Sequence, residues 1–151
     1  MALIGQEIAI IGAGIGGLAA AIALAQKGAK VQVFEQAEAL GEVGAGLQVS
    51  ANGVAVLKAL GLYEAAAKLA NTPEAIVLRD YRGGEVSRLP MGAAATARYG
   101  LPYWQFHRAD LLSVLVQGAR DAGVEIVFEH QINALAEVES GISIRFLNGV
   151  S

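Results

Sequence analysis

With 151 residues, 54% of them hydrophobic, and a mean hydropathy of +0.47, the chain is long enough to fold around a core and too apolar to be disordered. A net charge of −3 and a pI near 5.3 supply no positive field for a phosphate backbone, so no nucleic-acid partner is expected. Because cysteine is absent, disulfides, thiolate metal sites and cysteine nucleophiles are excluded. We predict a cytoplasmic protein without a metal site.

The first predicted elements lie in a run without charged residues from Ile8 to Ala25. The run is long enough to span a membrane, but its four glycines would weaken a continuous helix by about 1 kcal/mol each. No basic residue precedes it, as a signal peptide would require. We therefore expect no membrane partner. The run instead predicts a short buried strand at 7–11, a glycine turn, and a helix of small side chains over 17–28 that stops at Gly28.

A second strand is predicted at 30–35, and it ends in Glu35. Between the first strand and the helix, Gly12, Gly14 and Gly17 form the pattern G-x-G-x-x-G. The first glycine permits a tight turn, the second lets backbone N–H groups approach a pyrophosphate, and the third lets the helix pack close to the strand. Glu35 would accept hydrogen bonds from ribose hydroxyls. The unit predicts dinucleotide binding; a plain glycine turn beside an exposed acid is the alternative.

Five further elements follow from the pattern of apolar and turn residues, and together they predict an α/β fold. The first is a helix that ends at Gly61 and contributes Val54, Leu57 and Leu60 to the core, and the second is a hairpin over 75–90 that turns at Gly83 and Gly84. The third is a helix that ends near Gly123 and carries on one face Leu111, Leu112, Leu115, Val116 and Ala119. The last two are a buried strand over 124–130 that returns to the parallel sheet and a hairpin over 132–149 that turns at Ser140 and Gly141, with Asn148 and Gly149 suited to a second turn.

Three segments resemble the class A FAD-dependent aromatic hydroxylases, in particular the salicylate and hydroxybenzoate hydroxylases. They are GAGIGGLAAAIALAQKGAKVQVFE at 12–35, GEVGAGLQVSANGVAVLKALGLYEAA at 41–66 and YWQFHRADLLSVL at 103–115. The resemblance implies an incomplete Rossmann-like FAD-binding domain, a parallel sheet with helices and a β-meander, formed by 1–72 and 99–151. It also implies that 73–98 is a hairpin of the substrate-domain sheet, and that the remainder of such an enzyme is absent.

The resemblance also assigns the cofactor-binding residues. These are Gly12, Ala13, Gly14, Ile15, Gly16 and Gly17 in the turn, Glu35 and Gln36 after the second strand, Gly46, Leu47 and Gln48 in the GAGLQ segment, and Arg108 of the H-R-x-x-L pattern. Arg108 could equally be a surface cation beside Asp110, although a guanidinium suits phosphate or ribityl oxygens. The sequence departs from many relatives at Ala51, where they have proline, and this departure concerns the rigidity of the loop.

No residue is identified as catalytic. His107 and His130 belong to no recognisable pattern with an acid or a nucleophile, so we expect both to be structural. Tyr103 and Trp104 could approach a flavin or substrate, but we expect them to pack in an aromatic core.

For the intact enzyme, the resemblance implies that NADH or NADPH reduces FAD and that one atom of O2 is transferred to a phenolic or other aromatic acid. The 151-residue chain by itself is expected to lack turnover. Its unpaired strand edge and exposed apolar surface favour either self-association into a homo-oligomer or instability. Two alternatives stay open. An NAD-dependent dehydrogenase would share the Rossmann unit but gives no reason for GEVGAGLQVSANG, and a non-catalytic interaction module would keep the dinucleotide-binding fold alone.

Overall fold

The computed structural model describes residues 2–40, 45–147 and 149, and it divides into two compact units. Unit 1 comprises Met1–Glu42 and Leu115–Ser151, and unit 2 comprises Val43–Val114. Each unit has its own sheets and its own buried side chains, and each is described by itself.

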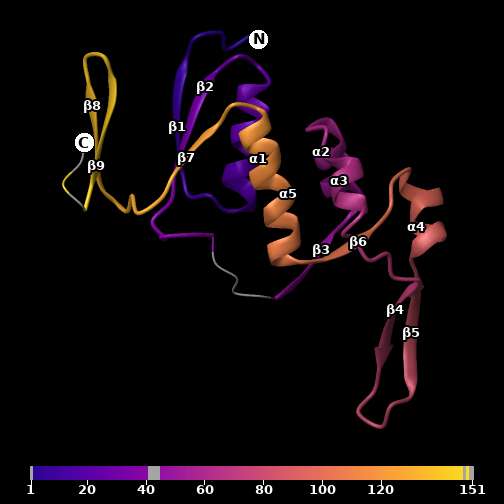
Figure 1. Cartoon of the computed structure of the whole chain (residues 1–151). Coiled ribbons are helices and arrows are strands. Elements are labelled where there is room, and N and C mark those ends of the chain that lie inside the picture. Colours follow the sequence, from indigo (N-terminus) through magenta and orange to yellow (C-terminus); the bar gives the residue numbers. More distant parts are fainter. Residues whose placement is uncertain (1, 41–44, 148, 150–151) are drawn as a thin grey trace. The chain divides into compact units, whose positions relative to one another are not determined.

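A three-stranded parallel sheet forms the centre of unit 1. Its strands are β1 (Glu7–Ile11), β2 (Lys30–Phe34) and β7 (Glu125–Val127), in the order β1-β2-β7 (Figure 1). Helix α1 (Ile15–Ala25) connects β1 to β2, and helix α5 (Arg108–Asp121) precedes β7. Because successive connections advance in one direction across the sheet, right-handed crossovers put α1 and the second half of α5 on the same face. The predicted parallel sheet with crossover helices is confirmed.

The sheet buries one face and exposes alternate residues on the other. Val31 and Val33 of β2 are buried, as are Leu18 and Ile22 of α1, the helix that packs against this strand. On β1 only alternate residues are shielded, and Ile11 is 49% exposed. The prediction that 7–11 is a buried strand is therefore wrong in part, because β1 lies at the edge of the described sheet and half of its side chains point away from α1.

Two predicted boundaries also differ from the structure. Helix α1 begins at Ile15, inside the glycine motif rather than after it, and ends before Gly28, whose φ is +92°. Strand β7 covers 125–127 rather than the predicted 124–130. The chain leaves the sheet early because Glu129 adopts a left-handed φ of +58°, which is incompatible with an extended strand.

The predicted C-terminal hairpin is confirmed in unit 1. Its strands are β8 (Ile132–Val138) and β9 (Gly141–Phe146), which pair antiparallel and form a two-stranded sheet (Figure 1, yellow). The chain turns between Val138 and Gly141, as expected. Of the predicted second turn, Asn148 lies outside the described residues, and the N–H of Gly149 donates to the carbonyl oxygen of Phe146 at 3.2 Å.

Unit 2 contains two antiparallel strand pairs joined by short helices. Strand β3 (Gly46–Val49) pairs with β6 (Trp104–His107), and strand β4 (Ala75–Arg79) pairs with β5 (Glu85–Pro90). The helices are α2 (Ala51–Ala59), α3 (Tyr63–Ala67) and α4 (Gly92–Tyr99). The predicted hairpin over 75–90 is confirmed as β4 and β5. The predicted helix before Gly61 is confirmed as α2, with Val54, Leu57 and Leu60 buried.

The β3–β6 pair and the helices α3 and α4 are additions that the sequence did not predict. The strands of the pair and α3 are too short to show periodicity. Helix α4 begins inside the segment 73–98, for which only a hairpin was expected, and extends one residue beyond it. The ring of Trp104 is 4% exposed and lies 5.0 Å from the ring of Tyr63 and 5.9 Å from that of Phe106, which confirms its predicted place in an aromatic core. The assignment of 73–98 to a substrate domain stays a prediction.

The helices of the described part of the chain are short or polar. None of them combines the length and the apolar character that crossing a bilayer requires.

The start of α2 provides a test of backbone rigidity. Ser50 precedes the helix in an extended conformation, with φ −74° and ψ 170°, which suits a residue before proline. Ala51 is the first helical residue, where a missing N–H costs no helical hydrogen bond. We predict that Ala51→Pro raises the free energy of unfolding by about 0.4–1 kcal/mol, because it restricts the unfolded chain. Thermal denaturation measures the effect, and a lower midpoint for the variant would contradict the described start of α2.

Candidate functional site

The glycine turn joins β1 to α1, and its three motif glycines have different surroundings. Gly12 has a φ of +93°, which L side chains rarely adopt, and its N–H donates to the carbonyl oxygen of Phe34 at 2.7 Å. A Cβ on Gly17 would overlap the carbonyl oxygen of Gly12 and lie 3.4 Å from Ile10 Cγ2. A Cβ on Gly14 would meet nothing within 4 Å. The backbone conformation thus requires the first glycine and close packing requires the third, whereas the second leaves its backbone open to an outside group.

The start of α1 is suited to an anion. The first helical hydrogen bond runs from the N–H of Leu18 to the carbonyl oxygen of Gly14 at 2.9 Å, so the N–H groups of Ile15, Gly16 and Gly17 precede it. In the described part of the chain, no side chain caps this helix and no acid lies in its first turn. These N–H groups and the positive end of the helix dipole favour a phosphate oxygen at this place.

Glu35 connects the end of β2 to the glycine turn. Its carboxylate oxygen Oε2 accepts from the backbone N–H of Ala13 at 2.8 Å, and Oε1 accepts from the N–H of Ala37 at 3.0 Å. Each carboxylate oxygen has a second lone pair, so both can still accept a hydroxyl of a ribose. Glu35 therefore holds the turn in place and remains able to bind a sugar.

A cavity of about 300 Å³ opens beside the turn in unit 1. Its lining combines the ends of β1 and β2 with the segment that follows β7: Ile11, Gly12, Phe34, Glu35, Gln36, His130, Gln131 and Ile132. Sequence reasoning predicted Gly12, Glu35 and Gln36 but missed 130–132. The available signal was indirect, because the carboxyl ends of neighbouring parallel strands share one edge of a sheet, where ligands of such folds bind.

The second group of predicted residues lies in unit 2. Gly46, Leu47 and Gln48 form most of β3, and the antiparallel register pairs Gly46 with His107. Arg108 follows directly, and its backbone N–H donates to the carbonyl oxygen of Ala45 at 3.3 Å. The pairing of β3 with β6 thus brings Arg108 beside the GAGLQ segment. The side chain of Arg108 is exposed at the start of α5.

A cavity of about 440 Å³ lies along this strand pair. It is lined by Gly46, Leu47, Gln48, Leu69, Asn71, Gln105, Phe106 and His107. Asn71 and Gln105 exchange two backbone hydrogen bonds of 2.8 Å, and the side-chain amide of Asn71 donates to Gln105 Oε1 at 3.0 Å. Sequence reasoning missed Leu69, Asn71 and Gln105, since a single amide beside a short strand carries no distinctive pattern.

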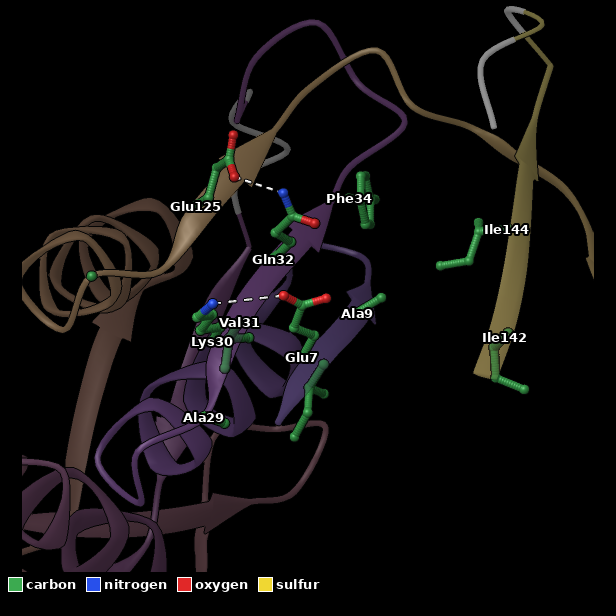
Figure 2. Close-up of a pocket in the computed structure, with 12 residues that line it drawn as sticks. Glu7, Ala9, Ala29, Lys30, Val31, Gln32, Phe34, Glu125, Ile142 and Ile144 are labelled. Atoms are coloured by element: carbon green, nitrogen blue, oxygen red, sulfur yellow. Dashed lines mark hydrogen bonds and ion pairs between the residues drawn. The ribbon is translucent and has the colours of Figure 1, made fainter. Parts of the chain in front are cut away.

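A larger cavity of about 590 Å³ lies against the open face of the unit 1 sheet. Figure 2 shows Ile142 and Ile144 of β9 across this cavity from Glu7, Gln32 and Phe34. The polar groups on its floor bind one another: Lys30 Nζ lies 3.7 Å from Glu7 Oε1, and Gln32 Nε2 donates to Glu125 Oε2 at 2.7 Å. We do not assign the ligand to this cavity, since no residue of the glycine turn lines it. Among the residues described, no group of three or more acidic or histidine side chains could hold a metal ion.

The parallel βαβ unit, the open Gly14 and the acid at the end of β2 together define a dinucleotide-binding domain of the Rossmann type. Comparison with known families gives the particular member of this class. A family described as FAD binding domain matches residues 6–150, and the chain belongs to that family.

Similar curated proteins include hydroxylases and monooxygenases of hydroxybenzoates and of hydroxynicotinate. The chain is 37% identical over 139 residues to 3-hydroxybenzoate 6-hydroxylase of Polaromonas naphthalenivorans (strain CJ2), which covers 91% of this chain and 35% of that protein. It is 41% identical over 121 residues to 3-amino-4-hydroxybenzoate 2-monooxygenase of Streptomyces cremeus, covering 80% of this chain and 31% of that protein. The chain spans about a third of the length of the curated relatives it matches.

Solved structures of flavin oxygenases share the fold. The tetrameric form of 2-methyl-3-hydroxypyridine-5-carboxylic acid oxygenase matches with a TM-score of 0.80 and 29% identity, over 97% of this chain and 36% of that one. Klebsiella pneumoniae HpxO complexed with FAD and uric acid matches with a TM-score of 0.81 and 29% identity, over 96% of this chain and 36% of that one. Both support the sequence-based expectation of a Rossmann-like FAD-binding domain.

Because Gly14 and Gly17 have different surroundings, we predict that alanine at Gly14 affects FAD binding and that alanine at Gly17 affects stability. Gly14→Ala should leave the unfolding midpoint close to that of the unchanged chain, since the new Cβ meets no protein atom, but should weaken FAD binding by at least about tenfold, or about 1.4 kcal/mol. Gly17→Ala should lower the free energy of unfolding by about 1–3 kcal/mol, because the helix must move away from Gly12. Denaturation and FAD titration of both variants measure the two effects. Unchanged FAD affinity in Gly14→Ala would place the pyrophosphate elsewhere.

Glu35 is expected to contribute to stability in the absence of any ligand. Glu35→Gln replaces one carboxylate oxygen by an NH2 group that faces a backbone N–H, so we predict a loss of about 1–3 kcal/mol in the free energy of unfolding. Glu38→Gln, at a nearby exposed position, makes the same change in charge and serves as control. Urea denaturation measures both variants, and equal stabilities would show that the two hydrogen bonds of Glu35 contribute nothing.

Proposed function

We propose that this chain is the FAD-binding portion of an NADH- or NADPH-dependent flavin monooxygenase that hydroxylates a phenolic or other aromatic acid. The observation that carries the proposal is the glycine turn, in which Gly12 is required by its positive φ and Gly17 by close packing, while Gly14 stays open next to Ala13, which donates to Glu35. The names of the relatives supply the reaction class, since they include hydroxylases and monooxygenases of hydroxybenzoate and hydroxynicotinate.

In unit 1, the turn and the end of β2 would hold the adenosine diphosphate half of FAD. The N–H groups of Ile15, Gly16 and Gly17 donate to the pyrophosphate, and Gly14 allows the phosphate to reach them. Glu35 accepts from the ribose hydroxyls. Gln36 lies in the wall of the adjacent cavity, where it contacts the same sugar or its base.

In unit 2, the strand pair β3–β6 would bind the flavin half. Gly46 presents backbone without a side chain, and Leu47 and Gln48 line the neighbouring cavity of about 440 Å³. Arg108 supplies a fixed fork of donors for ribityl or phosphate oxygens. FAD supplies the redox chemistry when it is bound, and the protein positions it and excludes water.

The substrate, the electron donor and the assembly rest on comparison. The relatives act on small aromatic acids, so we propose a substrate of this class together with O2. One similar oxygenase is described as tetrameric, which supports a homo-oligomer. The family match favours FAD over the NAD-dependent dehydrogenase alternative. The predicted cytoplasmic location stays a prediction.

Cofactor preference tests the proposal directly. We expect the chain to bind FAD at least about tenfold more tightly than NAD, a difference of about 1.4 kcal/mol. The reason is that the β3–β6 strand pair is proposed to contact the flavin, whereas the nicotinamide of NAD would gain no such contacts. Quenching of flavin fluorescence during titration measures FAD binding, and competition by NAD measures the alternative. NAD binding tighter than that of FAD would reject the proposed function in favour of a dehydrogenase.

A further inference from the structure

We propose that His130 is a positioning residue for the adenosine end of the cofactor, holding Glu35 in place through the segment that follows β7. The inference rests on the proposed binding of FAD at the glycine turn. From the sequence alone His130 was expected to be only structural, because it has no acid or nucleophile as partner. The contacts in unit 1 give it a specific task.

The backbone of Glu35 is bonded to the last residue of β7 and to the segment that follows this strand. The N–H of Glu35 donates to the carbonyl oxygen of Val127 at 2.8 Å, and the N–H of His130 donates to the carbonyl oxygen of Glu35 at 2.9 Å. A third bond runs from the N–H of Glu129 to the carbonyl oxygen of Ala37 at 3.1 Å. Any displacement of this segment therefore moves Glu35 and, with it, the carboxylate that faces the glycine turn.

The turn that makes these bonds possible contains an unfavourable residue. Among the described residues, Glu129 is the non-glycine residue with a positive φ, at +58°. Left-handed backbone is disfavoured for such a residue and persists where the surroundings compensate for it, often at binding sites. The Nδ1 atom of His130 lies 2.6 Å from the carbonyl oxygen of Phe128, on the other side of Glu129. Since a carbonyl only accepts, Nδ1 carries the proton and the bond closes the turn.

The ring of His130 is itself held by aromatic packing. It lies edge-on to Phe146 of β9, with the ring centroids 4.8 Å apart and an interplanar angle of 79°. The ring of Phe34, directly before Glu35, lies 5.8 Å away. His130 also lines the cavity of about 300 Å³ together with Gly12 and Glu35. The side chain thus makes two separable interactions, a hydrogen bond that closes the turn and a ring contact that contributes to the core.

Three substitutions separate these interactions. His130→Phe keeps an aromatic ring against Phe146 but cannot donate to Phe128. His130→Asn loses the ring but places its amide nitrogen near the position of Nδ1, where it can donate to the same carbonyl. His130→Gln is a second test of the hydrogen bond, because its longer side chain carries the amide past that position. The probes are ADP, followed by calorimetry, and FAD, followed by fluorescence, on the 151-residue chain.

We expect affinity to change independently of stability. His130→Phe and His130→Gln should bind both ADP and FAD about tenfold more weakly than the unchanged chain, as loss of one hydrogen bond that orients the site would cause. His130→Asn should bind both within about threefold of the unchanged chain, although its unfolding midpoint is lower, because the hydrogen bond is kept and the ring contact is lost. A merely structural residue would show affinity falling with the unfolding midpoint in all three variants.

Each outcome has a distinct meaning. If His130→Phe and His130→Gln bind ADP as tightly as the unchanged chain, or if His130→Asn loses as much affinity as they do, the positioning role is overturned and the proposed function stands. If the unchanged chain binds neither ADP nor FAD, the proposed function itself fails and this inference fails with it.

Discussion

The close approach of Gly17 to the carbonyl oxygen of Gly12 sets the geometry on which unit 1 depends. Any side chain at 17 would push the first turn of α1 away from the end of β1. With the two in contact, the helix starts at Ile15, within the motif, and its free N–H groups point out of the turn. Gly14, between these two glycines in the sequence, has no protein atom near the position of a Cβ, so the same short turn combines a close backbone contact with an open backbone position.

A network of hydrogen bonds then connects this turn to the neighbouring strands. Glu35 links Ala13 of the turn to the end of β2, while its own backbone is bonded to the segment after β7. Dinucleotide sites are often described by the acid at the end of the second strand alone. Here the segment after β7 is also bonded to this region, since the N–H groups of His130 and Glu129 donate to the carbonyl oxygens of Glu35 and Ala37. The contacts that fold this edge of the sheet are therefore the ones on which the proposed binding depends.

Unit 2 shows how a site can be assembled from distant parts of a sequence. The GAGLQ segment and the H-R-x-x-L segment are each unremarkable by local criteria, yet the register of β3 with β6 puts Gly46 opposite His107 and Arg108 beside Ala45. The pair also orders Asn71 through its bonds with Gln105. The polar lining of the adjacent cavity is thus a consequence of strand pairing rather than of a local motif.

The sequence alone determined the elements whose signal is local. Alternating valines in β2, the glycine triplet, and the apolar stripes that end at Gly61 and Gly123 each report a strand, turn or helix through the chain's own stereochemistry. The predicted roles of Gly12 and Gly17 within the turn were confirmed for the same reason, since φ and close packing are properties of a short segment.

Tertiary structure decided what depends on partners far along the chain. It placed β1 at the edge of the described sheet, so that Ile11 is exposed rather than buried, and it ended β7 at Val127 because the following residues bond to Glu35 and Ala37. It also selected His130 and Asn71 as neighbours of the predicted site. No local pattern marks these residues, because their roles arise from hydrogen bonds whose two ends lie far apart in the sequence and meet only after folding.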